Sequence, residues 1–209
     1  MCMQNPDSLS DEELMQLVAA SGDKRRQALT ELWRRWNRRL LNFIKEAIVQ
    51  NFHDAEDVVQ NVFHVLLSKG ATYDASRRFR PWVLRIAHNQ AVNFLREKGK
   101  HSAQPLDEEC DQVECDSPEP IEELIRDEEE LIRAGRNQRV QKAMSELPEH
   151  FRTVLYLKYF EHFTIEDIAD IMGQNPSATQ SLLHRARKAL RRLLEDGENP
   201  ETQTPEVKS

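Results

Sequence analysis

The chain has 209 residues, of which 39% are apolar and 31% are charged, and its formal net charge is −7. This composition excludes a chain that is disordered throughout, and the sequence lacks the run of about eighteen apolar residues that a membrane span needs. The acidic N-terminus lacks the apolar core of a secretory signal, and three cysteines are too few for a disulfide framework, so we expect a cytoplasmic protein.

The first unit, over residues 8–98, is predicted to contain four helices. Ser10 and Glu13 form a capping box at the start of the first helix. The second helix covers residues 24–49, because apolar residues recur there at helical spacing. We expect these apolar residues to lie on one buried face of the helix. They are Leu29, Leu32, Trp33, Trp36, Leu40, Phe43, Ile44 and Ala47.

The third helix is predicted to begin at Asp54, a suitable N-cap, with Glu56 and Asp57 in the first turn, where the helix dipole favours negative charge. One face carries Glu56, Gln60 and Asn61. The apolar face comprises Val59, Val62, Phe63 and Leu66. The helix is therefore expected to be amphipathic, with an acidic and amide surface opposite the core.

A polar loop precedes the fourth helix, in which Pro81 suits the first helical position. The residues expected to point inward are Trp82, Val83, Ile86, Ala87 and Phe94, and those free to point outward are Arg85, His88, Asn89, Asn93 and Arg96. Residues 77–100 hold seven basic side chains and one acid, which favours a polyanionic partner. A merely solvated arginine-rich face is the alternative interpretation.

Residues 99–135 are predicted to form a flexible acidic linker. Between residues 105 and 130, thirteen acids and one arginine give a charge of −12, which leaves +5 for the rest of the chain. Three prolines interrupt this segment, and a short helix is expected near residues 121–132. The linker separates the first unit from a second unit over residues 136–196, and residues 197–209 are expected to be a disordered tail.

The second unit is also predicted to contain four helices. A short helix over residues 137–146 precedes one that starts at Pro148. Thr164 caps a third helix, which Gly173 ends, and Asn175 with Pro176 opens a longer basic helix. This order is typical of a helix-turn-helix, whose second helix enters the DNA major groove. The alternative is a helical hairpin that binds no DNA.

Other chemistry has little support in the sequence. Cys110 and Cys115 are separated by four residues in the linker, but His101 is the only imidazole nearby, and zinc sites use four ligands. A redox role for these cysteines stays open. We find no nucleophile elbow and no zinc-protease motif, so the sequence predicts neither an enzyme nor a cofactor.

Four segments in a fixed order resemble bacterial RNA polymerase sigma factors of the extracytoplasmic-function (ECF) group. They are DAEDVVQNVFHVLL (54–67), FRPWVLRIAHNQAVNFLR (79–96), LPEHFRTVLYLKYFEHFTIEDIADIMG (147–173) and LLHRARKALRRLL (182–194). The resemblance implies an all-α fold, with an N-terminal four-helix unit and a C-terminal helix-turn-helix unit. It also implies core RNA polymerase and promoter DNA as partners, and an anti-sigma factor as a regulator.

The resemblance further implies roles for individual residues. The surface that docks on the large catalytic subunit of the polymerase corresponds to Asp54, Glu56, Asp57, Gln60, Asn61 and Phe63. The part that melts and reads the −10 element corresponds to Tyr73, Arg77, Arg78, Phe79, Arg80, Arg85, His88, Asn89, Asn93 and Arg96. Asn89 occupies the base-reading position, while Tyr73 and Phe79 are candidate platforms for unstacked bases.

The second unit corresponds to the reader of the −35 element. Its candidate contacts are Thr164, Ser177, Thr179, Gln180, Ser181, His184, Arg185, Arg187 and Lys188. The family usually places a Lys and an Arg early in the recognition helix, where this chain has only neutral residues over 179–183. We therefore expect a weaker or altered −35 contact. A stand-alone DNA-binding regulator, or a sigma-like protein that sequesters a partner, is the alternative function.

Overall fold

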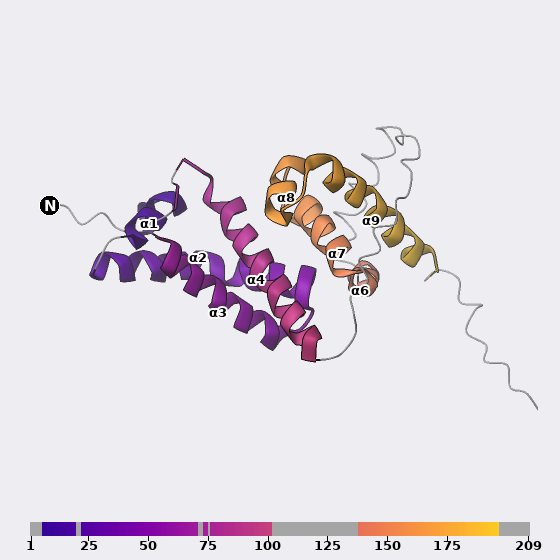
Figure 1. Ribbon diagram of the computed structural model, residues 1–209, viewed down its shortest axis with the longest axis horizontal. Coiled ribbons are helices and arrows are strands. Elements are labelled where there is room, and N and C mark those ends of the chain that lie inside the picture. The colour runs from indigo at the N-terminus through magenta and orange to yellow at the C-terminus, as the bar shows by residue number, and fades with distance from the viewer. Residues whose placement is uncertain (1–5, 20–21, 71–72, 75, 102–137, 197–209) are drawn as a thin grey trace, which may run out of the picture.

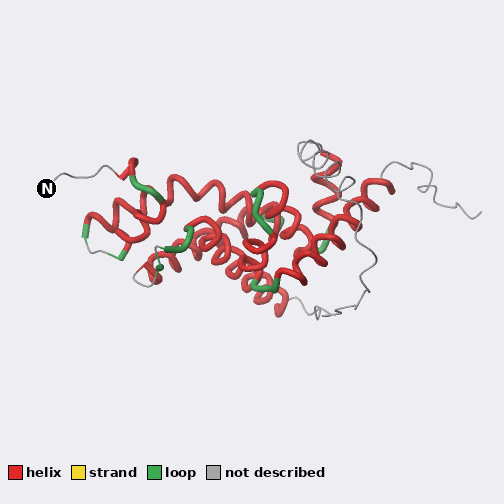
Figure 2. Tube along the Cα trace, turned by 90° about the horizontal axis from the view of Figure 1, so that it is seen from above, coloured by secondary structure: helices red, strands yellow, loops and turns green. Residues whose placement is uncertain are grey.

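The computed structural model describes residues 6–19, 22–70, 73, 74, 76–101 and 138–196, and within these ranges it contains helices and no strand (Figures 1 and 2). In chain order the elements are η1 (Pro6–Ser8), α1 (Asp11–Val18), α2 (Asp23–Phe43), η2 (Ile44–Val49), α3 (Phe52–Lys69), α4 (Phe79–His101), α6 (Gln138–Glu146), α7 (Glu149–Leu155), η4 (Tyr156–Phe160), α8 (Ile165–Met172) and α9 (Pro176–Asp196). The predicted all-α fold is confirmed.

The four predicted helices of the first unit are present, with two changed starts. The third helix, α3, begins at Phe52 instead of Asp54, because the side chain of Asn51 accepts a hydrogen bond from the Asp54 amide at 3.1 Å and caps the helix. The fourth, α4, begins at Phe79, so Pro81 lies at the third position of the helix. A proline is tolerated there because first-turn amides have no intrahelical acceptor.

Helix α2 buries a face slightly rotated from the predicted one. Trp33 was expected in the core but is 41% exposed, while Ala28 and Glu31 are buried. Glu31 can occupy a core position because Arg34 donates to it at 2.7 and 2.8 Å and Arg35 at 2.5 Å. The hydrogen bond from Arg34 is the largest cause that lowers the pKa of Glu31 to about 2. The carboxylate is therefore ionised and fully paired.

The capping signals of the second unit are found where the sequence predicts them. The Thr164 hydroxyl accepts a hydrogen bond from the Asp167 amide at 3.2 Å, and Gly173 ends α8 in a left-handed conformation with φ of 69°. The Asn175 side chain accepts from the Ala178 amide at 2.7 Å, directly before Pro176. The predicted helix-turn-helix is therefore formed by α8 and α9.

Two elements of the second unit pack on the first unit: α8 lies against α4, and α7 lies against η2 (Figure 1). The segment η2 directly follows α2 and has the wider geometry of a π-helix. Its last carbonyls lack intrahelical donors. Arg152 donates to the Ile48 carbonyl at 2.8 Å, and the Thr153 hydroxyl donates to the Ala47 carbonyl at 3.3 Å. Side chains of the second unit thus complete the hydrogen bonding of the first.

The predicted acidic linker and tail, including the short helix near residues 121–132 and the cysteines at 110 and 115, lie outside the described residues. The linker was expected to begin at Gly99, but α4 continues to His101. None of the described helices combines the length and the apolar character that a membrane span requires.

Candidate nucleic-acid interface

The polar face of α3 is exposed as predicted, with Glu56, Asp57, Gln60 and Asn61 all at the surface. Asp54 is partly buried and pairs with Lys98 of α4 at 2.6 Å. Phe63 lies in the core, as its place on the predicted apolar face requires, although the resemblance also implied a polymerase contact for it. It is covered by Trp33, whose ring centroid lies 4.5 Å away. Trp33 of α2 is itself 41% exposed, and Phe52 at the start of α3 is 46% exposed.

Aromatic residues of α4 and of the loop before it pack against one another. The Tyr73 ring packs on Trp82 at 4.7 Å, and its hydroxyl donates to the Arg77 carbonyl at 2.6 Å. Burial is the main cause that raises the pKa of Tyr73 to about 12. The structure corrects the prediction that Phe79 is a platform for a base. Phe79 is buried edge-on against Trp36, with ring centroids 5.3 Å apart. It is a core residue and offers no platform for a base.

One outer face of α4 carries the remaining polar candidates. Asn89, Asn93 and Arg96 are exposed and lie at spacings of four and three residues, so they line one side of the helix. Arg77 is exposed in the preceding loop. The three side chains of this helical row, and separately Arg77, can donate to phosphates, and the two asparagines can pair with base edges.

Three other arginines of the predicted −10 set contact acids of the second unit. Arg78 pairs with Asp167, Arg80 pairs with Glu161 at 2.7 Å, and Arg85 pairs with Asp170 at 2.5 Å. The three acids lie within residues 161–170, between η4 and the end of α8. Sequence reasoning missed these acids as functional residues, because their partners lie more than eighty residues away.

The structure also corrects the predicted position of His88. It was expected to point outward, but it is buried, and its Nε2 lies 3.9 Å from a carboxylate oxygen of Glu149, the first residue of α7. Burial lowers the pKa of His88, although a hydrogen bond with Asn89 opposes this effect. Burial likewise raises the pKa of Glu149. Both shifts favour the neutral forms, which suits a dry contact between the two units.

Helix α9 presents most of its predicted contacts to solvent. Ser177, Gln180, Arg185 and Lys188 are exposed, and Ser181, His184 and Arg187 are partly exposed. The structure corrects the prediction that Thr179 contacts DNA. Thr179 is fully buried, and its hydroxyl donates to the Asn175 carbonyl at 3.0 Å. Thr164 is exposed, but its hydroxyl is used as the cap of α8.

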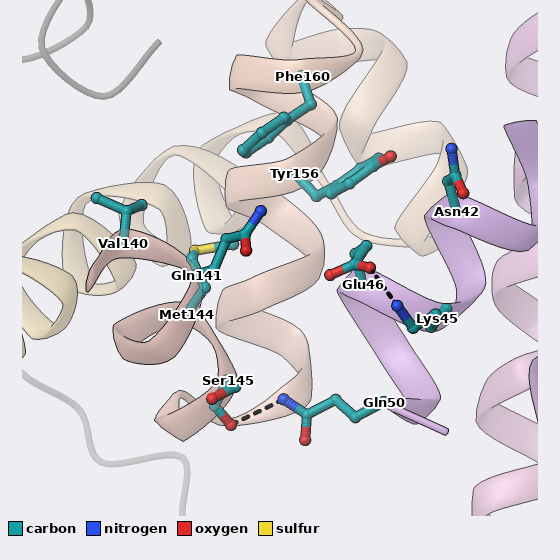
Figure 3. A pocket seen from close by; sticks show the side chains of 10 residues that line it. All are labelled: Asn42, Lys45, Glu46, Gln50, Val140, Gln141, Met144, Ser145, Tyr156 and Phe160. Atoms are coloured by element: carbon teal, nitrogen blue, oxygen red, sulfur yellow. Dashed lines mark hydrogen bonds and ion pairs between the residues drawn. The ribbon is translucent and has the colours of Figure 1, made fainter. Parts of the chain in front are cut away.

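A pocket of about 430 Å³ opens between the two units (Figure 3). One wall comes from α2 and η2, and the other from α6 and η4, where Tyr156 and Phe160 stack with centroids 5.0 Å apart. At its edge Gln50 donates to the Ser145 carbonyl at 2.7 Å. Among the described residues, no group of three or more His, Cys, Asp and Glu side chains could hold a metal ion.

Comparison with known proteins assigns both units. The family model for sigma-70 region 2 matches residues 32–101, and the model for sigma-70 region 4 matches residues 137–190, so together they cover more than half of the chain. The RNA polymerase sigma-H factor of Pseudomonas aeruginosa is 30% identical over 199 residues, which cover 90% of this chain and 96% of that protein. The ECF sigma factor SigW of Bacillus subtilis is 28% identical over 148 residues, 70% of this chain and 78% of that protein.

The chain belongs to the ECF group of RNA polymerase sigma factors. This sigma factor directs RNA polymerase to promoters, so its partners are the core polymerase and promoter DNA, and it is an initiation factor and not an enzyme. Its fold resembles that of the sigma factor RpoE of Bartonella quintana, solved in complex with the anti-sigma factor NepR. The TM-score is 0.57 at 21% identity, with 83% of this chain and 98% of the other covered.

The buried histidine predicts a pH dependence of stability. The unfolded chain takes up a proton on His88 below its ordinary pKa of about 6.5, whereas the folded protein resists it. The stability that His88 contributes is therefore present above about pH 6.5 and is lost as the pH falls toward the lowered pKa. We expect the free energy of unfolding, measured by urea denaturation, to fall between about pH 7.5 and 5.5.

The variant His88→Gln should reduce this slope, and His64→Gln, at an exposed position of α3, should not. His150, whose pKa is also lowered by burial, contributes with the same sign in every variant. Glu149 acts in the opposite direction, because a raised pKa makes ionisation at higher pH destabilising. Equal slopes for His88→Gln and the parent protein would contradict the prediction.

Proposed function

We propose that residues 8–98 bind core RNA polymerase and open the −10 element, that residues 136–196 bind the −35 element, and that residues 99–135 connect the two units. The proposal is supported by the regions that the family models match and by the polar surfaces that the two units expose. The polymerase-binding surface is assigned to the outer face of α3, through Glu56, Asp57, Gln60 and Asn61.

The exposed face of α4 carries the proposed −10 recognition. Asn89 and Asn93 each offer an amide that can pair with two groups of one base edge, as adenine requires. Arg96 at the end of this row and Arg77 in the loop before α4 supply charge for the phosphates of an unpaired strand. Tyr73, half-buried beside Trp82, is the remaining aromatic candidate for stacking with a base. This exposed row of amides is the observation that carries the assignment.

The proposed −35 contact is made by α9. Arg185 and Lys188 suit phosphate oxygens, and Ser177, Gln180 and His184 lie nearer the start of the helix, where base edges are read. The early Lys and Arg of the family pattern are absent, so the charged contacts come later in the helix. We also propose that the protein acts in the cytoplasm and is regulated by an anti-sigma factor, because RpoE of Bartonella quintana was solved with NepR.

Run-off transcription with purified core polymerase on a library of promoters tests the −10 assignment. We expect sequence-dependent initiation, and we expect Asn89→Ala to change the preferred base at one −10 position by about 1–3 kcal/mol of discrimination, because one bidentate base contact is lost. Gln27→Ala, an exposed amide at the start of α2, is the matched control. An unchanged −10 preference in Asn89→Ala would remove Asn89 from the reading set. Stable polymerase binding without initiation would instead support a sequestering role.

Neutralising two cations of α9 tests the −35 assignment. The double variant Arg185→Gln and Lys188→Gln should weaken duplex binding almost equally for all sequences, because phosphate contacts carry no base information. The slope of log K against log salt should become shallower by about two, one for each lost phosphate contact. Lys142→Gln on α6, also exposed, should leave the slope unchanged. Binding should be measured by fluorescence anisotropy, and a slope equal to that of the parent protein contradicts the assignment.

A further inference from the structure

Helix α1 contacts both ends of the segment that joins α3 to α4. At the α4 end, the Phe79 amide donates to the Glu12 carboxylate at 2.8 Å. At the α3 end, Gly70 is buried against Val18, and a Cβ atom on this glycine would lie only 2.7 Å from Val18 Cγ1. Between the two contacts lie loop residues that the proposed function assigns to −10 DNA, among them Tyr73. Helix α1 therefore touches the loop where it begins and where it ends.

The Glu12 carboxylate satisfies the start of α4. The first amides of a helix lack intrahelical acceptors, and the positive end of the helix dipole favours a nearby acid. In α4 this end also carries Arg78 and Arg80, which add positive charge where it is least favourable. Glu12 supplies both an acceptor and an opposite charge, although it lies 67 residues earlier in the chain.

Helix α1 is itself fixed on α2. The Asp11 carboxylate accepts from the Arg35 guanidinium and from the Trp36 indole, both at 2.9 Å. The helix also has an apolar side that is buried in the core. Because α1 is held in this way, the position of Glu12 determines where the first turn of α4 can lie. The buried residues of α1 are Leu14, Met15 and Val18.

Gly70 shows that the second contact depends on a close approach. Its φ of −51° and ψ of −42° are those of an ordinary helix, so its conformation does not require a glycine. A side chain at this position would press on α1, because the carbonyl carbon of Val18 and the nitrogen of Ala19 lie 3.2 and 3.3 Å from the Cβ position. The glycine therefore allows the end of α3 to lie directly against α1.

The two contacts also hold the aromatic candidate of the loop. The Tyr73 ring lies edge-on to the Phe79 ring, with centroids 6.1 Å apart, so fixing Phe79 supports Tyr73. Burial is the main cause of the raised pKa of Tyr73, and the negative charge of Glu12 is the next, which means that this carboxylate also lies near the Tyr73 hydroxyl.

Resting on the −10 assignment above, we propose that α1 positions the −10-binding segment, and that Glu12 is a positioning residue that holds the start of α4 and the preceding loop ready to capture an unpaired strand. Glu12 acts through the Phe79 amide and makes no contact with DNA. Opening a duplex requires that a base be held outside the stack. A segment that is ordered in advance loses less conformational entropy when it captures that base.

The test compares run-off transcription, with saturating core polymerase, on a duplex promoter and on the same promoter with its −10 region already unpaired by mismatches. The ratio of the two rates cancels differences in the amount of folded, polymerase-bound protein, so a purely structural role would not change it. The variants are Glu12→Ala and Glu12→Gln, which keeps an oxygen acceptor for the Phe79 amide. Gln16→Ala, at an exposed position one turn further along α1, is the control.

We expect the ratio of duplex to unpaired template to fall about fivefold in Glu12→Ala, as for the loss of one hydrogen bond, and to stay within about twofold of the parent in Glu12→Gln. Gln16→Ala should leave it unchanged. Removing an acid strengthens DNA binding in general, so a loss of opening cannot come from the change in net charge. Equal losses on both templates in Glu12→Ala would overturn the proposal.

The Gly70 contact has a compensating test. Gly70→Ala should lower the same ratio, because the added Cβ atom meets Val18 Cγ1. Adding Val18→Ala to this variant removes that atom and should restore part of the ratio. An unchanged ratio in Gly70→Ala, or a fall that Val18→Ala does not relieve, would contradict the positioning of the loop by α1.

Hydrogen exchange of the Phe79 amide, measured by NMR on the free protein, needs neither polymerase nor DNA. It should be faster in Glu12→Ala and unchanged in Gln16→Ala. Unchanged exchange in Glu12→Ala overturns the proposal, and so does faster exchange with an unchanged ratio of rates.

The Asn89→Ala experiment separates this proposal from the proposed function. If Asn89→Ala leaves the −10 preference unchanged while Glu12→Ala lowers the ratio, the reading residue is wrong and the positioning role is supported. If Asn89→Ala changes the preference while Glu12→Ala leaves the ratio unchanged, the positioning role is wrong and the −10 assignment is retained.

Discussion

One buried carboxylate joins the two halves of the molecule. Glu161 lies between guanidinium groups from α2 and α4, and removing a carboxylate from water is costly unless such partners are present. The start of α8 follows four residues later, so the pairing of Glu161 fixes where the helix-turn-helix meets the first unit. The carbonyls of Ala47 and Ile48, which accept from Thr153 and Arg152, hold the other end of the same boundary.

The sequence predicts the helices well where the deciding interactions span only a few residues. The capping box at Ser10, the caps at Thr164 and Asn175 and the left-handed Gly173 all lie where their local patterns indicate. Helical spacing also predicts most of the core. The boundaries moved by two residues where a competing cap or a tolerated proline was available, as at Asn51.

The sequence predicts less where a residue's environment comes from another element. Phe79 packs edge-on against Trp36 of α2, and the buried His88 lies beside Glu149 of α7; neither partner is visible from the spacing within α4. The count of charges correctly predicts an arginine-rich surface before and within α4. It does not reveal that Asp167 and Asp170, which read as ordinary acids of a short helix, neutralise part of that surface.

The burial of Thr179 limits which side of α9 is open to the proposed −35 contact. With its hydroxyl bonded to the Asn175 carbonyl, the helix cannot rotate to offer this residue, and Ser177, Gln180 and His184 are left at the leading end. A serine hydroxyl extends little beyond the backbone, so in the proposed contact the helix would have to sit deep in the groove or use ordered water to reach the bases. We therefore expect the upstream element to be selected largely by its width and flexibility, with base identity contributing at few positions.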